Sequence, residues 1–249
     1  EFPKHQFAWK VLAVVLKQNG KISESLVAGQ KSVQLDPQDA EVHYNLGNAL
    51  QELGRFKEAE ESYRKAITLK PDFAEAYYNL GNILKELGRL NEAQASYKQT
   101  IALKPDNAEA YSNLGNALQE LGRLDEAQAS YKQVIALKPD FAEAYYNLGN
   151  ILKELGRLNE AQASYKQAIA LKPDFAEAPS NLGVILQELG RFKEAEESCR
   201  KAITLKPDFA DAYSNLGNAL QELGRLEEAE KSYRKAIDLK SSFREAECG

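Results

Sequence analysis

Apolar side chains in residues 74–107 recur with the spacing of amphipathic helices. Tyr77, Leu80 and Leu84 fall at positions i, i+3 and i+7, which lie on one face of an α-helix. Gly88 follows this stripe, at a place where the left-handed end of a helix favours glycine. The pattern predicts a first amphipathic helix that ends in a tight turn at Gly88.

A second apolar stripe begins directly after this turn. Ala93, Tyr97 and Ile101 stand four residues apart, which again places them on one helical face. Pro105 stops the second helix, because proline lacks an N–H group and its ring clashes with the preceding turn. Residues 74–107 are therefore expected to form two antiparallel helices joined by a short turn.

Short-range signals indicate where these helices begin and how closely they pack. Asp72 and Glu75 have the spacing of a capping box for the first helix, and Asn91 is a suitable N-cap for the second. Gly81 and Ala93 are small residues on the two predicted apolar faces. We expect them to lie where the two helices approach each other most closely.

The whole pattern repeats with a period of 34 residues. Proline keeps this step at Pro37, Pro71, Pro105, Pro139, Pro173 and Pro207. The period predicts a single array over residues 6–243, divided into seven repeats: 6–39, 40–73, 74–107, 108–141, 142–175, 176–209 and 210–243. Residues 244–249 are predicted to be the truncated start of a further repeat. A lone helix pair cannot bury both of its faces, so each repeat is expected to stack on the next.

These positions resemble the tetratricopeptide repeat (TPR) family. The resemblance rests on the motif Tyr145-x-x-Leu148-Gly149 followed by Ala161, Tyr165, Ala168 and Pro173. It implies an all-α fold, a right-handed α-solenoid or superhelix, in which the first helices line a concave groove. The sequence is also similar to the repeat arm of O-GlcNAc transferases, where such a groove holds extended peptides.

Composition excludes several classes of function. A formal net charge of -5 and a pI of about 5.4 argue against binding to nucleic acid or to an anionic membrane. The longest apolar run, residues 11–16, is far too short to span a bilayer. The chain has two cysteines, Cys199 and Cys248, and two histidines, His5 and His43, without metal-ligand or catalytic spacing. We therefore expect no metal, no cofactor and no enzymatic activity, and a cytoplasmic location by default.

The resemblance assigns peptide binding to first-helix positions that face the groove. In this chain the candidates are Tyr44, Asn45, Asn48, Tyr78, Asn79, Asn82, Lys85, Asn113, Asn116, Tyr146, Asn147, Asn150, Lys153, Asn181, Asn215 and Asn218. Asparagine both donates and accepts hydrogen bonds, so a regular row can hold a peptide backbone. The alternative interpretation is that asparagine at these positions only serves the repeat itself.

Charge at the groove edge indicates the kind of partner. Glu52, Glu86, Glu120 and Glu154 repeat along this edge. An acidic edge favours other proteins or extended peptides that are neutral or basic.

Two repeats depart from the pattern. In repeat 6–39, Ala13 stands at the glycine position, and Gly29 takes the place of the second-helix tyrosine. In repeat 176–209, Pro179, Val184 and Cys199 replace a tyrosine, an asparagine and a tyrosine. We expect Cys199 to be a small buried filler and its layer to be locally weak.

Three functional hypotheses follow from these features. The first is a protein-interaction scaffold with a peptide-binding groove. The second is the docking arm of a larger transferase-type enzyme, because the sequence lacks methionine altogether. The third is self-association through uncapped terminal repeats, since Leu226, Tyr233 and Ile237 are expected to expose an apolar face.

Overall fold

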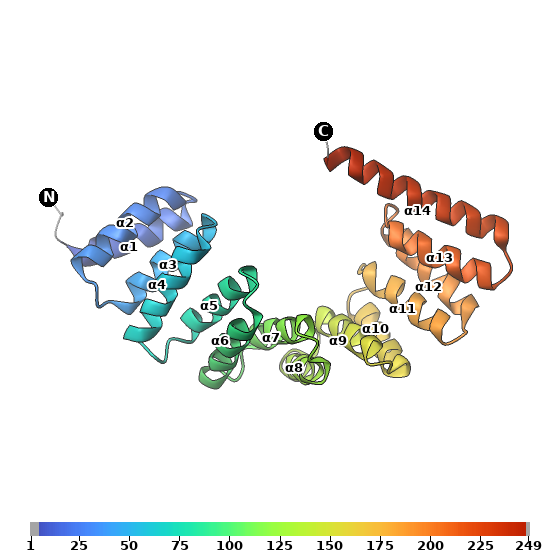
Figure 1. Cartoon of the computed structure of the whole chain (residues 1–249), viewed down its shortest axis with the longest axis horizontal. Helices are drawn as coiled ribbons and strands as arrows, with labels where there is room; N and C mark the ends of the chain where they lie inside the picture. The colour runs from blue at the N-terminus through green and yellow to red at the C-terminus, as the bar shows by residue number, and fades with distance from the viewer. Residues whose placement is uncertain (1–4, 248–249) are drawn as a thin grey trace. The chain divides into compact units, whose positions relative to one another are not determined.

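A computed structural model describes residues 5–247, with side chains described as far as residue 240. Within this range the chain forms fourteen α-helices that follow one another in antiparallel pairs (Figure 1). The helices are α1 Gln6–Gln18, α2 Ile22–Leu35, α3 Ala40–Glu52, α4 Phe56–Leu69, α5 Ala74–Glu86, α6 Leu90–Leu103, α7 Ala108–Glu120, α8 Leu124–Leu137, α9 Ala142–Glu154, α10 Leu158–Leu171, α11 Glu177–Glu188, α12 Phe192–Leu205, α13 Ala210–Glu222 and α14 Leu226–Glu247. The predicted all-α solenoid of seven helix-turn-helix repeats is confirmed. Cys248 lies outside the described residues.

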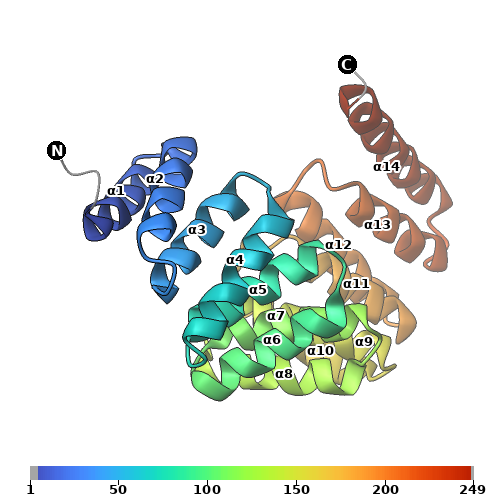
Figure 2. The same ribbon diagram turned by 60° about the vertical axis from the view of Figure 1, so that its left-hand side comes forward.

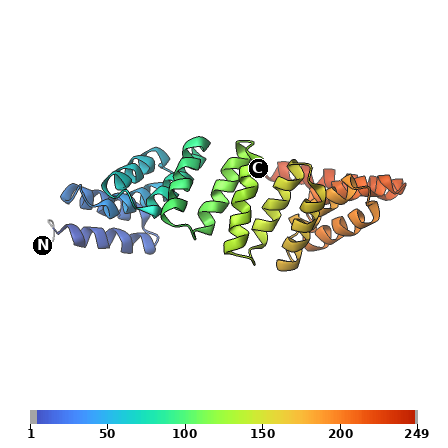
Figure 3. The same ribbon diagram turned by 90° about the horizontal axis from the view of Figure 1, so that it is seen from below.

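The chain divides into two compact parts, residues 1–130 and residues 131–249, and the division falls within α8. In the N-terminal part, α2 packs against α3, α4 against α5, and α6 against α7 (Figure 2). In the C-terminal part, α10 packs against α11, and α12 against α13. The paired helices α1 and α2, blue in Figure 3, lie side by side along their length. The second helices α2, α4, α6, α10 and α12 thus each contact both their own partner and the first helix of the next repeat.

Glycine shapes both the turn and the contact within a repeat. Gly88 adopts a left-handed backbone with φ of 72°, as predicted for the helix end. Gly81 lies directly under the ring of Tyr97, so close that an added Cβ would stand 2.6 Å from the ring edge. Ala93 and Tyr97 are fully buried. The small residues therefore stand where the helices approach most closely, as the sequence predicts.

The predicted caps of repeat 74–107 are wrong. Helix α5 begins at Ala74 with Phe73 as its N-cap, and no side chain caps it. Asp72 stands one residue too early to act as the N-cap, and Glu75 instead forms an ion pair with Lys104 at the end of α6. Side-chain capping requires the acceptor in the N-cap position itself, as at Asp39 before α3.

The second helix of this repeat also begins differently from the prediction. Helix α6 starts at Leu90, with Arg89 as its N-cap in place of the predicted Asn91. The Arg89 guanidinium binds Glu92 in the first turn, with Nε 2.7 Å from Oε1. It also reaches back to Glu60 of the preceding repeat, with Nη1 2.7 Å from Oε2. The turn thus helps to fix one repeat on the next, although exposed ion pairs each stabilise little.

Helix α14 differs from the other second helices. Those helices end two residues before a proline, whereas Ser241 stands at the proline position and α14 runs on to Glu247. Without proline the backbone can continue its helical hydrogen bonds. Leu226 and Ile237 are 65% and 63% exposed, so this helix presents apolar side chains to its surroundings as expected. The assignment of residues 244–249 to a further repeat stays a prediction.

Candidate functional site

The predicted groove residues lie on one face of the first helices and are partly accessible. Tyr44, Asn45 and Asn48 come from α3, and Tyr78 and Asn79 from α5; all five are half-buried. Helical periodicity places them on the side opposite the buried stripe of the same helix. These side chains are therefore accessible and form a regular row of amide groups. We call this side of the first helices the groove face.

A hydrogen-bond cluster joins these residues across neighbouring repeats. The Tyr63 hydroxyl of α4 donates to Asn48 Oδ1 at 2.8 Å. The Asn79 Nδ2 group of α5 donates to the same oxygen at 2.9 Å and to Tyr44 Oη at 3.3 Å. One second helix and two successive first helices thus meet at Asn48. We call this four-residue arrangement the amide clasp.

The amide clasp recurs in both parts of the chain. The equivalent residues are Tyr97, Asn82, Asn113 and Tyr78 in the N-terminal part, and Tyr165, Asn150, Asn181 and Tyr146 in the C-terminal part. Their donor–acceptor distances lie between 2.8 and 3.1 Å. The row of asparagines predicted to bind peptide therefore also holds successive repeats together.

The first clasp leaves some hydrogen-bonding groups over. Asn48 Oδ1 accepts two bonds and Asn79 Nδ2 donates two, which uses the capacity of both groups. No other hydrogen bond among the described residues uses Asn48 Nδ2 or Asn79 Oδ1. The Asn48 Nδ2 donor and the Asn79 Oδ1 acceptor are thus available on the groove face. The clasp fixes the orientation of both amides.

The remaining predicted residues fall outside these three clasps. Asn218 accepts from the Tyr233 hydroxyl at 2.7 Å, and Asn215 donates to Ser180 Oγ at 3.2 Å. Val184 stands where a clasp asparagine would be, so Asn215 lacks that acceptor. The other members, each partly exposed on its own first helix, are Asn45, Lys85, Asn116, Asn147 and Lys153.

Burial raises the pKa of four second-helix tyrosines, three of which belong to the clasps. The rings of Tyr63, Tyr97, Tyr131 and Tyr165 are fully buried. Burial raises the pKa of all four phenols well above the ordinary value, because the phenolate would lose its hydration. The folded chain stabilises the neutral hydroxyl. In Tyr63, Tyr97 and Tyr165 this hydroxyl donates to the clasp asparagine.

We expect the fold to lose stability at alkaline pH. The folded phenols have raised pKa values, so their contribution is complete below about pH 10, where the unfolded tyrosines ionise. It is lost as pH rises towards the folded pKa, by about 1.4 kcal/mol per pH unit for each buried tyrosine. Denaturant titrations at increasing pH, combined with tyrosinate absorbance, measure this. Ionisation of all tyrosines together near pH 10, with no loss of stability, would contradict it.

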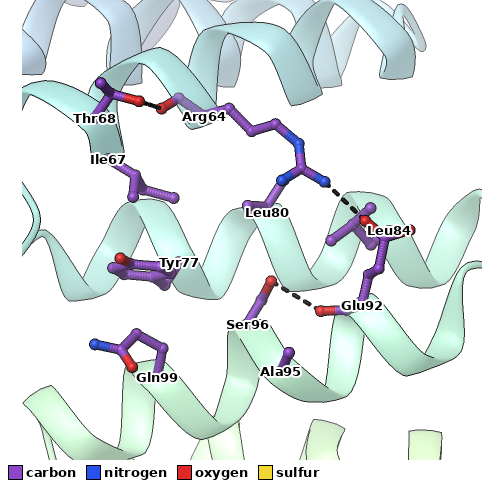
Figure 4. A pocket seen from close by; sticks show the side chains of 10 residues that line it. All are labelled: Arg64, Ile67, Thr68, Tyr77, Leu80, Leu84, Glu92, Ala95, Ser96 and Gln99. Carbon is purple, nitrogen blue, oxygen red and sulfur yellow. Dashed lines mark hydrogen bonds and ion pairs between the residues drawn. The ribbon is translucent and has the colours of Figure 1, made fainter.

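A pocket lies on the other face of α5, between α4 and α6 (Figure 4). Its volume is about 590 Å³, and Tyr77 and Leu80 contribute apolar surface to it. Arg64 of α4 reaches across to Glu92 of α6, with Nη2 3.0 Å from Oε2. The Ser96 hydroxyl donates to the carbonyl of Glu92 in its own helix. These rim groups are paired with one another, and sequence reasoning missed the pocket because it lies between second helices.

The described residues include no group of three or more His, Cys, Asp and Glu side chains that could hold a metal ion. None of the helices between residues 5 and 247 combines the length and the apolar character that a membrane crossing requires.

Comparisons with known proteins cover almost the whole array. The family model described as "TPR repeat" matches residues 15–54, 47–88, 81–122, 119–156 and 149–190, and the model "Tetratricopeptide repeat" matches residues 174–242. None of the curated proteins matches the chain.

Several solved structures resemble the chain. The structure of MamA is 30% identical with a TM-score of 0.63, and the match covers 67% of this chain and 97% of MamA. YrrB, described as a TPR protein with an unusual peptide-binding site, is 26% identical with a TM-score of 0.66 over 74% and 95% of the two chains. PilF of Pseudomonas aeruginosa, at 20% identity, has a TM-score of 0.68 over 83% and 94%, and shows the shared fold alone. The 34-residue period, the helix pairs and these matches show that the chain belongs to the tetratricopeptide repeat family.

Proposed function

We propose that this chain is a non-catalytic protein-interaction scaffold that binds an extended peptide segment along its first helices. The observation that carries the proposal is the amide clasp, which leaves an amide donor and an amide acceptor on the groove face. An extended peptide backbone offers the complementary carbonyl and N–H groups. Because the clasp fixes the side chains in advance, binding costs little side-chain entropy.

The asparagine row accommodates both interpretations of its role. In the first clasp, Asn48 and Asn79 use one end of each amide to join repeats, and the other end stays available. Structural and binding roles therefore do not compete for the same atoms. The peptide-binding site named in the YrrB structure, a relative of the same family, is consistent with such a use.

The charge at the groove edge favours neutral or basic segments. Glu86 and Glu120 lie exposed at the C-terminal ends of α5 and α7, whereas Glu52 at the end of α3 is paired with Lys17. Carboxylates at these helix ends strengthen the negative potential that the helix dipoles create there. A positively charged partner would therefore be attracted, more strongly at low salt.

Backbone methylation tests the proposal without altering the protein. Random linear peptides are selected on the immobilised whole chain, and the best binder is remade with alternate peptide nitrogens methylated. If the groove amides bind the backbone, the affinity should fall by about tenfold or more, equivalent to about 1.4 kcal/mol. Methylation of the terminal residues of the same peptide serves as the control and should change little. Equal affinities of all versions would refute backbone recognition.

A pair of variants locates the binding face. We expect Asn79→Ala combined with Asn113→Ala to weaken the selected peptide. Asn91→Ala combined with Asn159→Ala is the matched control, since both are exposed asparagines at the start of second helices. Unfolding curves of both variants separate loss of binding from loss of stability. Equal weakening by the two pairs would remove the groove from consideration.

A further inference from the structure

The groove face changes character in the first repeat. At the two positions where α3, α5, α7, α9 and α13 carry asparagine, α1 carries Val11 and Val14. Both valines are accessible, at 43% and 36% exposure. An exposed pair of β-branched apolar residues replaces the amide row at this place. The surface available to a bound segment is therefore apolar at α1 and amide-rich from α3 onwards.

The first repeat also lacks the buried ring that fills each clasp. Gly29 of α2 stands at the position that Tyr63 occupies in the next repeat. The side chain of Leu46 covers Gly29, with Cδ1 3.5 Å from the place of an added Cβ. No phenol, however, reaches the groove face at this position. A pocket of about 290 Å³ lies between α1 and α3 and is lined by Ala13, Val14, Lys17, Gln18, Ser25, Asn45 and Asn48.

The charged and hydroxyl groups of this pocket are already paired. The Ser25 hydroxyl donates to the carbonyl of Ala13 at 2.7 Å. Lys17 Nζ lies 2.9 Å from Glu52 Oε1, so its charge is balanced at the rim. The methyl groups of Ala13 and Val14 and the aliphatic stem of Lys17 are left as contact surface. The pocket thus has no unbalanced charge, and its apolar part lies beside the amide groups of Gln18, Asn45 and Asn48.

Asn45 gives the pocket an unused amide. Asn79, its counterpart in the next repeat, donates to Tyr44 and Asn48 of the preceding repeat. For Asn45, the residues at those two positions of the preceding repeat are Lys10 and Val14. Valine offers no acceptor. Lys10 is a donor and is bound to acidic groups, with Nζ 2.8 Å from Asp39. No hydrogen bond among the described residues uses the Asn45 amide, so both its donors and its acceptor are available.

We propose that this pocket is an anchor site for one bulky aliphatic side chain, leucine-like in size, of the segment bound in the groove. The Asn45 amide binds the peptide group next to that side chain, and Val14 provides the apolar wall. This inference rests on the proposed peptide-binding function and adds a residue class and a position to it. The volume lies just below the range of small-molecule ligand sites and leaves room for one bulky side chain.

Capped single amino acids test the anchor site directly. N-acetyl-leucine N-methylamide is titrated into the whole chain with valine methyl groups labelled for NMR, and N-acetyl-alanine N-methylamide is the control probe. We expect the leucine probe to shift the Val14 methyl signals saturably, and the alanine probe to bind at least about tenfold more weakly, because it buries less apolar area. Equal binding of the two probes, or shifts confined to other valines, would overturn the proposal.

Two matched variants control for surface effects. Val14→Asp places a carboxylate in the pocket wall, whereas Val15→Asp makes the same change at an exposed neighbour that does not line the pocket. Val14→Asp should abolish the leucine shift, and Val15→Asp should preserve it; equal effects would overturn the proposal. Circular dichroism verifies that both variants fold. The methylated-peptide experiment tests the groove separately, so the anchor can fail while backbone recognition succeeds.

Discussion

Replacement of Tyr165 by alanine is expected to lower the free energy of unfolding by about 3–5 kcal/mol, the usual cost of removing a large buried ring. The ring is fully buried, and its edge lies against Gly149, where an added Cβ would stand 2.6 Å away. Its hydroxyl donates to Asn150 at 2.8 Å and completes a clasp. Alanine would leave a cavity between two helices and an asparagine oxygen with one bond fewer. Denaturant unfolding followed by circular dichroism measures the loss.

Two further variants divide this loss into its causes. Tyr165→Phe removes only the hydroxyl and should cost about 1 kcal/mol. Cys199 occupies the position of Tyr165 in the next repeat. Cys199→Ala removes only a sulfur atom and should also lower the free energy of unfolding by about 1 kcal/mol. Cys199 is as deeply buried as Tyr165, so burial is matched and ring size differs. Similar losses from Tyr165→Ala and Cys199→Ala would show that the ring does not determine the stability of its layer.

The sequence predicted the role of Cys199 correctly because the period assigns it a position. The period places it at the second-helix tyrosine, which faces the core in other repeats. In the structure the thiol is fully buried, and burial raises its pKa to about 12. A thiol with that pKa is protonated near neutral pH and is a poor nucleophile. The prediction of a small filler is confirmed, whereas the expected weakness of its layer stays a prediction.

Other features depend on geometry that spacing does not reveal. Asp72 and Glu75 have the spacing of a capping box, yet the helix begins at Ala74, one residue too late for Asp72 to be its N-cap. Likewise, Asn48 and Asn79 are 31 residues apart, and their contact exists only because α3 and α5 stand side by side. The periodicity identified both asparagines as candidates. It could not show that the same side chains also join neighbouring repeats.

The first repeat shows how a sequence departure becomes a local structure. The sequence identified Ala13 and Gly29 as exceptions to the repeat pattern. It could not show the pocket, because the cavity also depends on Asn45 of α3, which belongs to the next repeat. The 34-residue period therefore predicts contacts within a repeat better than contacts between repeats.

The same substitution at two helical glycines is expected to have opposite effects on stability. In Gly81→Ala, the new Cβ would stand 2.6 Å from Tyr97 Cε1, and the buried ring has little room to move. We expect a destabilisation of about 1–3 kcal/mol from this overpacking. In Gly29→Ala, the nearest atom is Leu46 Cδ1 at 3.5 Å, an ordinary contact. Alanine is the better helix former, so this variant should gain up to about 1 kcal/mol.

Comparison of these two variants shows how much the close approach of the two helices contributes to the change in stability. Both glycines lie inside helices, Gly81 in α5 and Gly29 in α2, so alanine improves helix propensity at both sites. A difference in sign can then come only from what the new methyl group meets. Denaturant midpoints of the two variants, compared with the unmodified chain, give that sign directly. Stabilisation by both would mean that Tyr97 yields readily, and that glycine is not required where the tyrosine ring crosses the first helix.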